Sequence, residues 1–85
     1  MSVTSLYFAG LRETLGKASE TLVLTPDLAT VAAVRGHLVA RGGAYATSLD
    51  AKRAVRAAVN QDMIRGDAPI KSGDEIAFFP PVTGG

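Results

Sequence analysis

The sequence contains no cysteine and only one histidine, His37. The lack of thiols excludes disulfide bonds, thiolate metal ligands and a thiol nucleophile. A histidine-based metal centre or a Ser-His-Asp arrangement would depend on that single imidazole, so we expect no metal site, and His37 is expected to be a solvated helix residue. The net charge of +1 gives no strong electrostatic case for nucleic acid as a partner.

Long apolar runs are also missing. No stretch of about 18 apolar residues occurs, so we expect neither a membrane span nor a membrane partner. The start of the chain, Met1 to Ser5, lacks the basic residues and apolar stretch of a signal peptide, which favours a cytoplasmic location. With 85 residues, of which 47% are hydrophobic, the chain is expected to form one domain around one core.

The N-terminal part is predicted to form a β-hairpin. Residues 3–9 are rich in β-branched and aromatic side chains, and residues 20–25 place two leucines on one face. Gly10 and Gly16 bracket a polar segment that we expect to be a loop between these strands.

One amphipathic helix is predicted next. Thr30 is a plausible N-cap, and the three apolar residues Val31, Val34 and Leu38 follow at helical spacing. Gly42-Gly43 is expected to end this helix, because glycine adopts the left-handed cap conformation most easily.

The rest of the domain is predicted to add two strands, at residues 55–59 and 75–79, while residues 44–54 stay ambiguous with a short helical turn. The order strand, strand, helix, strand, strand gives an α+β domain over residues 1–79. One helix covers only one face of a small sheet, so the other face is expected to keep apolar side chains. Such a patch usually binds a protein, although scattered exposed apolar residues are also ordinary surface.

The final eight residues, Phe78-Phe79-Pro80-Pro81-Val82-Thr83-Gly84-Gly85, are the most specific feature of the sequence. They resemble the C-terminus of the small subunit of molybdopterin synthase, a sulfur carrier of the ubiquitin-like superfamily. A terminal Gly-Gly alone would be weak evidence. Further matching segments are Gly73-Asp74-Glu75-Ile76-Ala77, Ala58-Val59-Asn60-Gln61, and Phe8-Ala9 with Arg12-Glu13 and Gly16.

This resemblance implies a β-grasp (ubiquitin-like) fold with a protruding tail at residues 80–85. It also implies that the Gly85 carboxylate is adenylated by a partner adenylyltransferase of the E1-like class, which uses ATP, and is then thiocarboxylated from a sulfur donor protein. The tail next donates sulfur to a cyclic pterin precursor inside the large subunit, forming the dithiolene of molybdopterin. The family arrangement is a heterotetramer of two small and two large subunits. The chain itself is then neither catalytic alone nor a cofactor-binding protein.

The tail residues suit this role. Gly84 and Gly85 lack Cβ atoms, so a narrow channel can close around the main chain. Pro80 and Pro81 keep the tail extended and lower the entropy lost on insertion, with Val82 and Thr83 following inside the partner. From Pro80 to Gly85 the reach is roughly 20 Å.

Four other residues are candidates for partner binding. Phe79, Phe8 and Leu6 are expected to form an apolar docking patch, and Arg12 is a candidate contact for the adenylyltransferase, although a solvated turn arginine is an equal alternative. Phe78 is expected to be core because it pairs with Ile76. Lys52, Arg53 and Arg56 form a small basic cluster that is usually just a solvated face.

Three alternatives remain open at this point. The chain could carry sulfur in another pathway, such as thiamine synthesis or tRNA thiolation, against which residues 79–83 argue. It could be a ubiquitin-like modifier that forms isopeptide conjugates. It could also be a non-catalytic interaction module, which would tolerate truncation of the tail.

Overall fold

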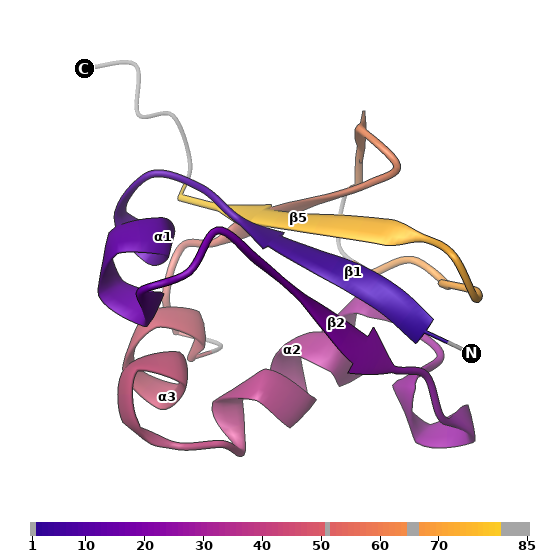
Figure 1. Ribbon diagram of the computed structural model, residues 1–85, viewed down its shortest axis with the longest axis horizontal. Helices are drawn as coiled ribbons and strands as arrows, with labels where there is room; N and C mark the ends of the chain where they lie inside the picture. The colour runs from indigo at the N-terminus through magenta and orange to yellow at the C-terminus, as the bar shows by residue number, and fades with distance from the viewer. Residues whose placement is uncertain (1, 51, 65–66, 81–85) are drawn as a thin grey trace.

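The computed structural model describes residues 2–50, 52–64 and 67–80. These residues form a mixed five-stranded sheet with the order β2-β1-β5-β3-β4, and α2 and α3 lie on one side of it (Figure 1). The elements in chain order are β1 (Ser2–Tyr7), α1 (Gly10–Leu15), β2 (Ser19–Val23), the 3-10 turn η1 (Pro26–Leu28), α2 (Val31–Val39), α3 (Gly43–Leu49), β3 (Arg56–Val59), β4 (Asp62–Met63) and β5 (Glu75–Phe79).

The two central strands, β1 and β5, run parallel and alternate between a buried and a half-buried face. Val3 and Tyr7 of β1 point into the core at 1% exposure, as do Ile76 and Phe78 of β5 at 0% and 1%. This alternation follows from the two-residue period of a strand. The prediction that Phe78 is a core residue is confirmed.

Helix α2 supplies the other half of the core. The side chain of Thr30 caps it, because its Oγ1 accepts a hydrogen bond from the Ala33 N–H at 3.1 Å. Val31, Val34 and Leu38 are 4%, 0% and 0% exposed, as their helical spacing predicts. The helix ends at Val39, earlier than predicted. The positive-φ residues Gly42 and Gly43 instead carry the chain into α3.

Two elements differ from the sequence prediction. Residues 10–15 form the helix α1, where we expected a polar loop, because Leu11 is buried at 7% exposure and Gly16 closes the helix in the left-handed conformation. The antiparallel pairing of β1 with β2 is nevertheless confirmed, with Ser2 opposite Val23. Strand β4 was not predicted. It forms because Asn60 and Gln61 both have positive φ and reverse the chain directly after β3.

Arg35 holds part of residues 44–54, the segment whose structure was ambiguous in the sequence, in place by hydrogen bonds. Its guanidinium donates hydrogen bonds to the carbonyl oxygens of Leu49 at 2.6 Å, Asp50 at 2.6 Å and Arg53 at 3.0 Å. These bonds satisfy carbonyls at and beyond the end of α3, which would otherwise lack partners. Arg35 thereby fixes the connection from α3 to β3 against α2.

Within the described ranges, no helix is long and apolar enough to cross a membrane. In the same part of the chain, no three histidine or carboxylate side chains come close enough together to hold a metal ion.

Candidate functional site: the sheet edge at the root of the tail

The tail begins at the edge of the sheet where β1 and β5 both end. Because these strands are parallel, Tyr7 and Phe78 stand side by side there, and Pro80 follows the last residue of β5. Pro80 is the one predicted tail residue that the structure describes. The other predicted tail residues lie outside the described residues: Pro81, Val82, Thr83, Gly84 and the reactive Gly85.

Phe8 and Phe79 lie at this root, on the face of the sheet turned away from the helices. Phe8 directly follows the buried Tyr7, its N–H donates to the Phe78 carbonyl oxygen at 3.2 Å, and its side chain is 46% exposed. Phe79 follows the buried Phe78 and pairs in register with Arg56 of β3. Both phenylalanines thus follow a buried neighbour at the end of a central strand, and their role in partner binding stays a prediction.

A second row on the same face extends the apolar surface. Leu6 pairs with Ala77, Ala77 pairs with Ala58, and Ala58 pairs with Met63, which is 59% exposed. Met63 was missed in the sequence, because its position depends on the unpredicted strand β4. We call the surface formed by these exposed or half-buried apolar side chains the outer patch; its members are Leu6, Phe8, Met63, Ala77 and Phe79.

Arg12 lies on a different element from the outer patch. It is an exposed residue of α1, which packs beside β5 near the root of the tail. The structure therefore separates the predicted partner-binding residues into two groups, an apolar one on the sheet and a charged one on the neighbouring helix.

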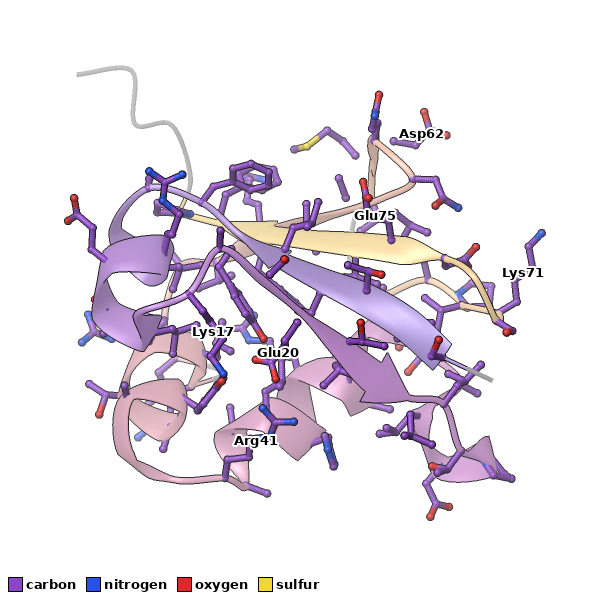
Figure 2. The ribbon with its side chains drawn as sticks, in the orientation of Figure 1. Lys17, Glu20, Arg41, Asp62, Lys71 and Glu75 are labelled. Carbon is purple, nitrogen blue, oxygen red and sulfur yellow. The ribbon has the colours of Figure 1, made fainter. Side chains whose placement is uncertain are left out.

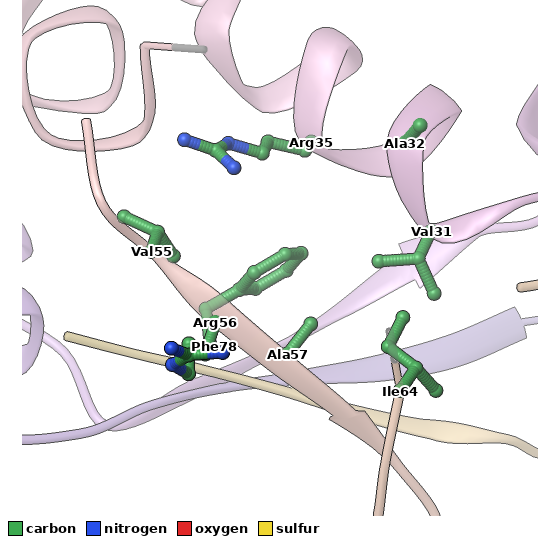
Figure 3. A pocket seen from close by; sticks show the side chains of 8 residues that line it. All are labelled: Val31, Ala32, Arg35, Val55, Arg56, Ala57, Ile64 and Phe78. Carbon is green, nitrogen blue, oxygen red and sulfur yellow. The ribbon is translucent and has the colours of Figure 1, made fainter. Parts of the chain in front are cut away.

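A separate hollow lies between α2 and β3 (Figure 3). It holds about 590 Å³, and Figure 3 shows the Phe78 ring pointing from the sheet toward α2, with Arg35 above it. The described residues that line it carry no carboxylate, hydroxyl or imidazole group. Arg35 is already bonded to three carbonyl oxygens. This hollow therefore has no set of free polar groups suited to acid–base or nucleophilic chemistry.

Comparison with known proteins decides the family. The model of the ThiS family matches residues 5–85, which is nearly the whole chain. The chain belongs to the ThiS family. Together with the two relatives and the solved structures described next, this match confirms the resemblance inferred from the sequence and the β-grasp fold.

Two relatives of this ThiS-family chain are named molybdopterin synthase sulfur carrier subunit. The one from Haemophilus influenzae is 45% identical over 80 residues, covering 94% of this chain and 95% of the relative. The one from Escherichia coli is 42% identical over 80 residues with the same coverage of 94% and 95%.

Solved structures show the same fold. SAMP1 from Haloferax volcanii superposes with a TM-score of 0.77 at 28% identity and covers 100% of both chains. A chain from the complex of subunits 1 and 2 of the molybdopterin-converting factor of Helicobacter pylori gives a TM-score of 0.67 at 23% identity, again over 100% of both chains.

Proposed function

We propose that this chain is the sulfur carrier subunit of a molybdopterin synthase. The observation that carries the proposal is the identity of 45% and 42% to two sulfur carrier subunits over 94% of the chain.

The reactive group in this proposal is the carboxylate of Gly85. A carboxylate is a poor electrophile because its negative charge repels nucleophiles. An E1-like adenylyltransferase transfers AMP from ATP to one carboxylate oxygen and releases pyrophosphate. Hydrosulfide supplied by a sulfur donor protein then attacks the carbonyl carbon and expels AMP, which leaves a thiocarboxylate and releases a proton. ATP is bound by the partner, and the carrier needs no cofactor of its own. Because the cycle consumes ATP, we propose a cytoplasmic location.

The thiocarboxylate then gives its sulfur to a cyclic pterin precursor within the large subunit of the synthase. In this step Pro80 and Pro81 direct the tail outward, and Val82, Thr83 and Gly84 occupy the channel that leads to the pterin. A chain without cysteine carries sulfur here without any thiol side chain of its own.

The outer patch is the proposed docking surface for the large subunit. It begins at Phe79, next to the root of the tail, so a protein that closes around the tail also meets the apolar face of the sheet. The likeness to a subunit of the Helicobacter pylori complex of subunits 1 and 2 supports a large-subunit partner. We extend the proposal to two carriers on a dimer of large subunits, and to Arg12 as a contact for the adenylyltransferase.

Blocking the terminal carboxylate tests this mechanism. A variant with a short uncleaved peptide fused after Gly85, and a second variant that lacks Gly85, should both keep their far-ultraviolet circular dichroism and unfolding midpoint but lose sulfur transfer. Intact mass of the wild-type chain from cells should show the gain of one sulfur in place of oxygen. Sulfur transfer by the fused variant would refute the mechanism.

The likeness to SAMP1, the small archaeal modifier protein 1 of Haloferax volcanii, makes a ubiquitin-like modifier the second candidate. A modifier forms isopeptide bonds to lysines of target proteins, which appear as bands of higher mass that contain this chain. A carrier for thiamine synthesis or tRNA thiolation would differ from the proposed one in the molecule that accepts the sulfur. The acceptor would then be a thiazole precursor or a tRNA base instead of the pterin.

A further inference from the structure

A groove with a mostly apolar lining lies at the root of the tail, on the side opposite the outer patch. It holds about 510 Å³ between α1, α3 and the connection that leads into β3. Its lining includes Arg53 and Pro80. Because Pro80 is one of its walls, a protein that encloses the tail must also cover this groove.

Arg53 is the charged residue of this groove, and the surrounding backbone holds it in place. Its Nε donates to the Thr47 carbonyl oxygen at 3.0 Å, its own N–H donates to the Asp50 carbonyl oxygen at 2.8 Å, and its carbonyl oxygen accepts from Arg35 at 3.0 Å. These bonds fix the backbone and one edge of the guanidinium, which stays exposed.

Arg56 is placed on the other side of the same root. It pairs in register with Phe79 and is exposed, so it borders the outer patch. In Figure 3 its guanidinium lies apart from the Phe78 ring, at the level of the sheet. We call Arg53 and Arg56 together the basic collar. Both ion pairs found among the described residues involve Glu20, so no described carboxylate lies within 4.0 Å of the collar.

The opposite end of the sheet carries carboxylates. Glu75 stands where β5 begins, and Asp62 lies in β4, both on the far side of the sheet from α1, where Lys71 also lies (Figure 2). Such a charge separation orients a small protein as it approaches a charged partner.

We propose that the basic collar requires acidic side chains on the protein that receives the tail, the large subunit of the synthase. This inference rests on the proposed function. Enclosing the tail root removes water from the guanidinium groups of Arg53 and Arg56. A desolvated cation without a counter-charge is strongly unfavourable, so a partner with a purely apolar rim is rejected and one with carboxylates is selected.

Neutralising single charges tests the collar. Arg53→Gln and Arg56→Gln are compared with the control Lys71→Gln, which removes one exposed positive charge from the turn before β5, at the acidic end. The dissociation constant of the complex with the large subunit is measured from about 0.05 to 0.5 M NaCl, a range over which exposed charges become screened. We expect each arginine variant to bind roughly two- to fivefold more weakly at low salt, with the difference shrinking as salt rises, and the control to match wild type.

Two outcomes would refute the proposed role of the basic collar. In one, the arginine variants bind as tightly as Lys71→Gln at every salt concentration. In the other, they bind more weakly by a factor that salt does not change, which indicates lost packing instead of lost charge. If wild type binds and transfers sulfur in either case, the proposed function stands and only the collar is wrong. If wild type does not bind the large subunit at all, the proposed function and the collar both fail.

Discussion

Glu20 ties three separate parts of the chain together. Its carboxylate accepts hydrogen bonds from the hydroxyl groups of Tyr7 and Tyr45, both at 2.7 Å, and from Arg41 at 2.6 Å. Figure 2 shows Lys17 and Arg41 near it. Burial alone would raise the pKa of Glu20, but the hydrogen bonds from Arg41, Tyr45 and Tyr7 lower it to about 2 from its ordinary 4.5. Burial and the neighbouring Glu20 also raise the pKa of the Tyr7 hydroxyl.

This low pKa predicts acid lability. Because the folded state binds the Glu20 proton more weakly than the unfolded state, the ionised carboxylate stabilises the fold fully above pH 4.5, and this stabilisation is lost as the pH falls toward 2. The loss is on the order of 2–3 kcal/mol. Glu20→Gln should lower the free energy of unfolding at pH 7 by a similar amount. It should also flatten the dependence on pH across that window, measured by urea unfolding.

Glu13→Gln is the matched control, since Glu13 is an exposed carboxylate of α1. It should leave the free energy of unfolding at pH 7 near that of wild type. An equal loss of stability in both variants would show that the Glu20 hydrogen bonds contribute nothing particular to the fold.

At the scale of elements, α2 depends on the cap at Thr30. The hydroxyl of Thr30 accepts from the Ala33 N–H, and the carboxylate of Asp67 accepts from the Ala32 N–H at 2.8 Å. Two of the N–H groups that every helix leaves unpaired at its start are thus satisfied. The Asp67 bond joins the helix to a segment 35 residues away in the sequence.

Removing the cap should destabilise the whole domain. Thr30→Ala is expected to cost about 1 kcal/mol, which corresponds to a fall in Tm of roughly 4–8 °C for a domain of this size. Thr30→Ser keeps the oxygen acceptor and should stay close to wild type in the same thermal unfolding experiment. A Thr30→Ala variant as stable as Thr30→Ser would mean that the hydroxyl does not cap α2 in solution.

The predictability of each element follows from where its stabilising contacts lie. Helix α2 was predicted because its cap and apolar spacing are all local in sequence. Helix α1 was missed because it has only six residues, so its single apolar pair, Leu11 and Leu15 at i, i+4, is too short to reveal a helical period. Strand β4 has two residues, both exposed, and depends on a turn at Asn60-Gln61. Its register is set by β3, which local sequence does not reveal.

At the scale of the whole molecule, the candidate site was partly predictable. Alternation within single strands is enough to expect Leu6, Phe8 and Phe79 on the face away from the helix. Met63 could not be assigned, since three strand pairings connect it to Leu6. The placement of Arg53 and Arg56 on opposite sides of the tail root also needs the three-dimensional fold. In the sequence, Arg53 and Arg56 belong to one basic cluster, which gave no reason to separate them.

Met63 and Phe79 are predicted to bind the large subunit through the outer patch. Phe79→Ala and Met63→Ser should each weaken the complex roughly tenfold or more, the effect of removing about 1.4 kcal/mol or more of buried apolar contact. Both side chains are at least partly exposed. Their loss should therefore change the unfolding midpoint little, and isothermal titration measures the affinity directly.

Val23→Ser provides the control for this last prediction. Val23 is also an exposed apolar residue, at 72%, but it lies at the end of the edge strand β2, opposite Ser2 and far along the sheet from the tail root. If apolar exposure alone drives binding, Val23→Ser weakens the complex as much as Met63→Ser does, and the outer patch is not the docking surface. If the position of the side chain on the sheet determines binding, the Val23→Ser variant binds the large subunit like wild type. The second result is the expected one, because a protein that encloses the tail meets the sheet first at Phe79.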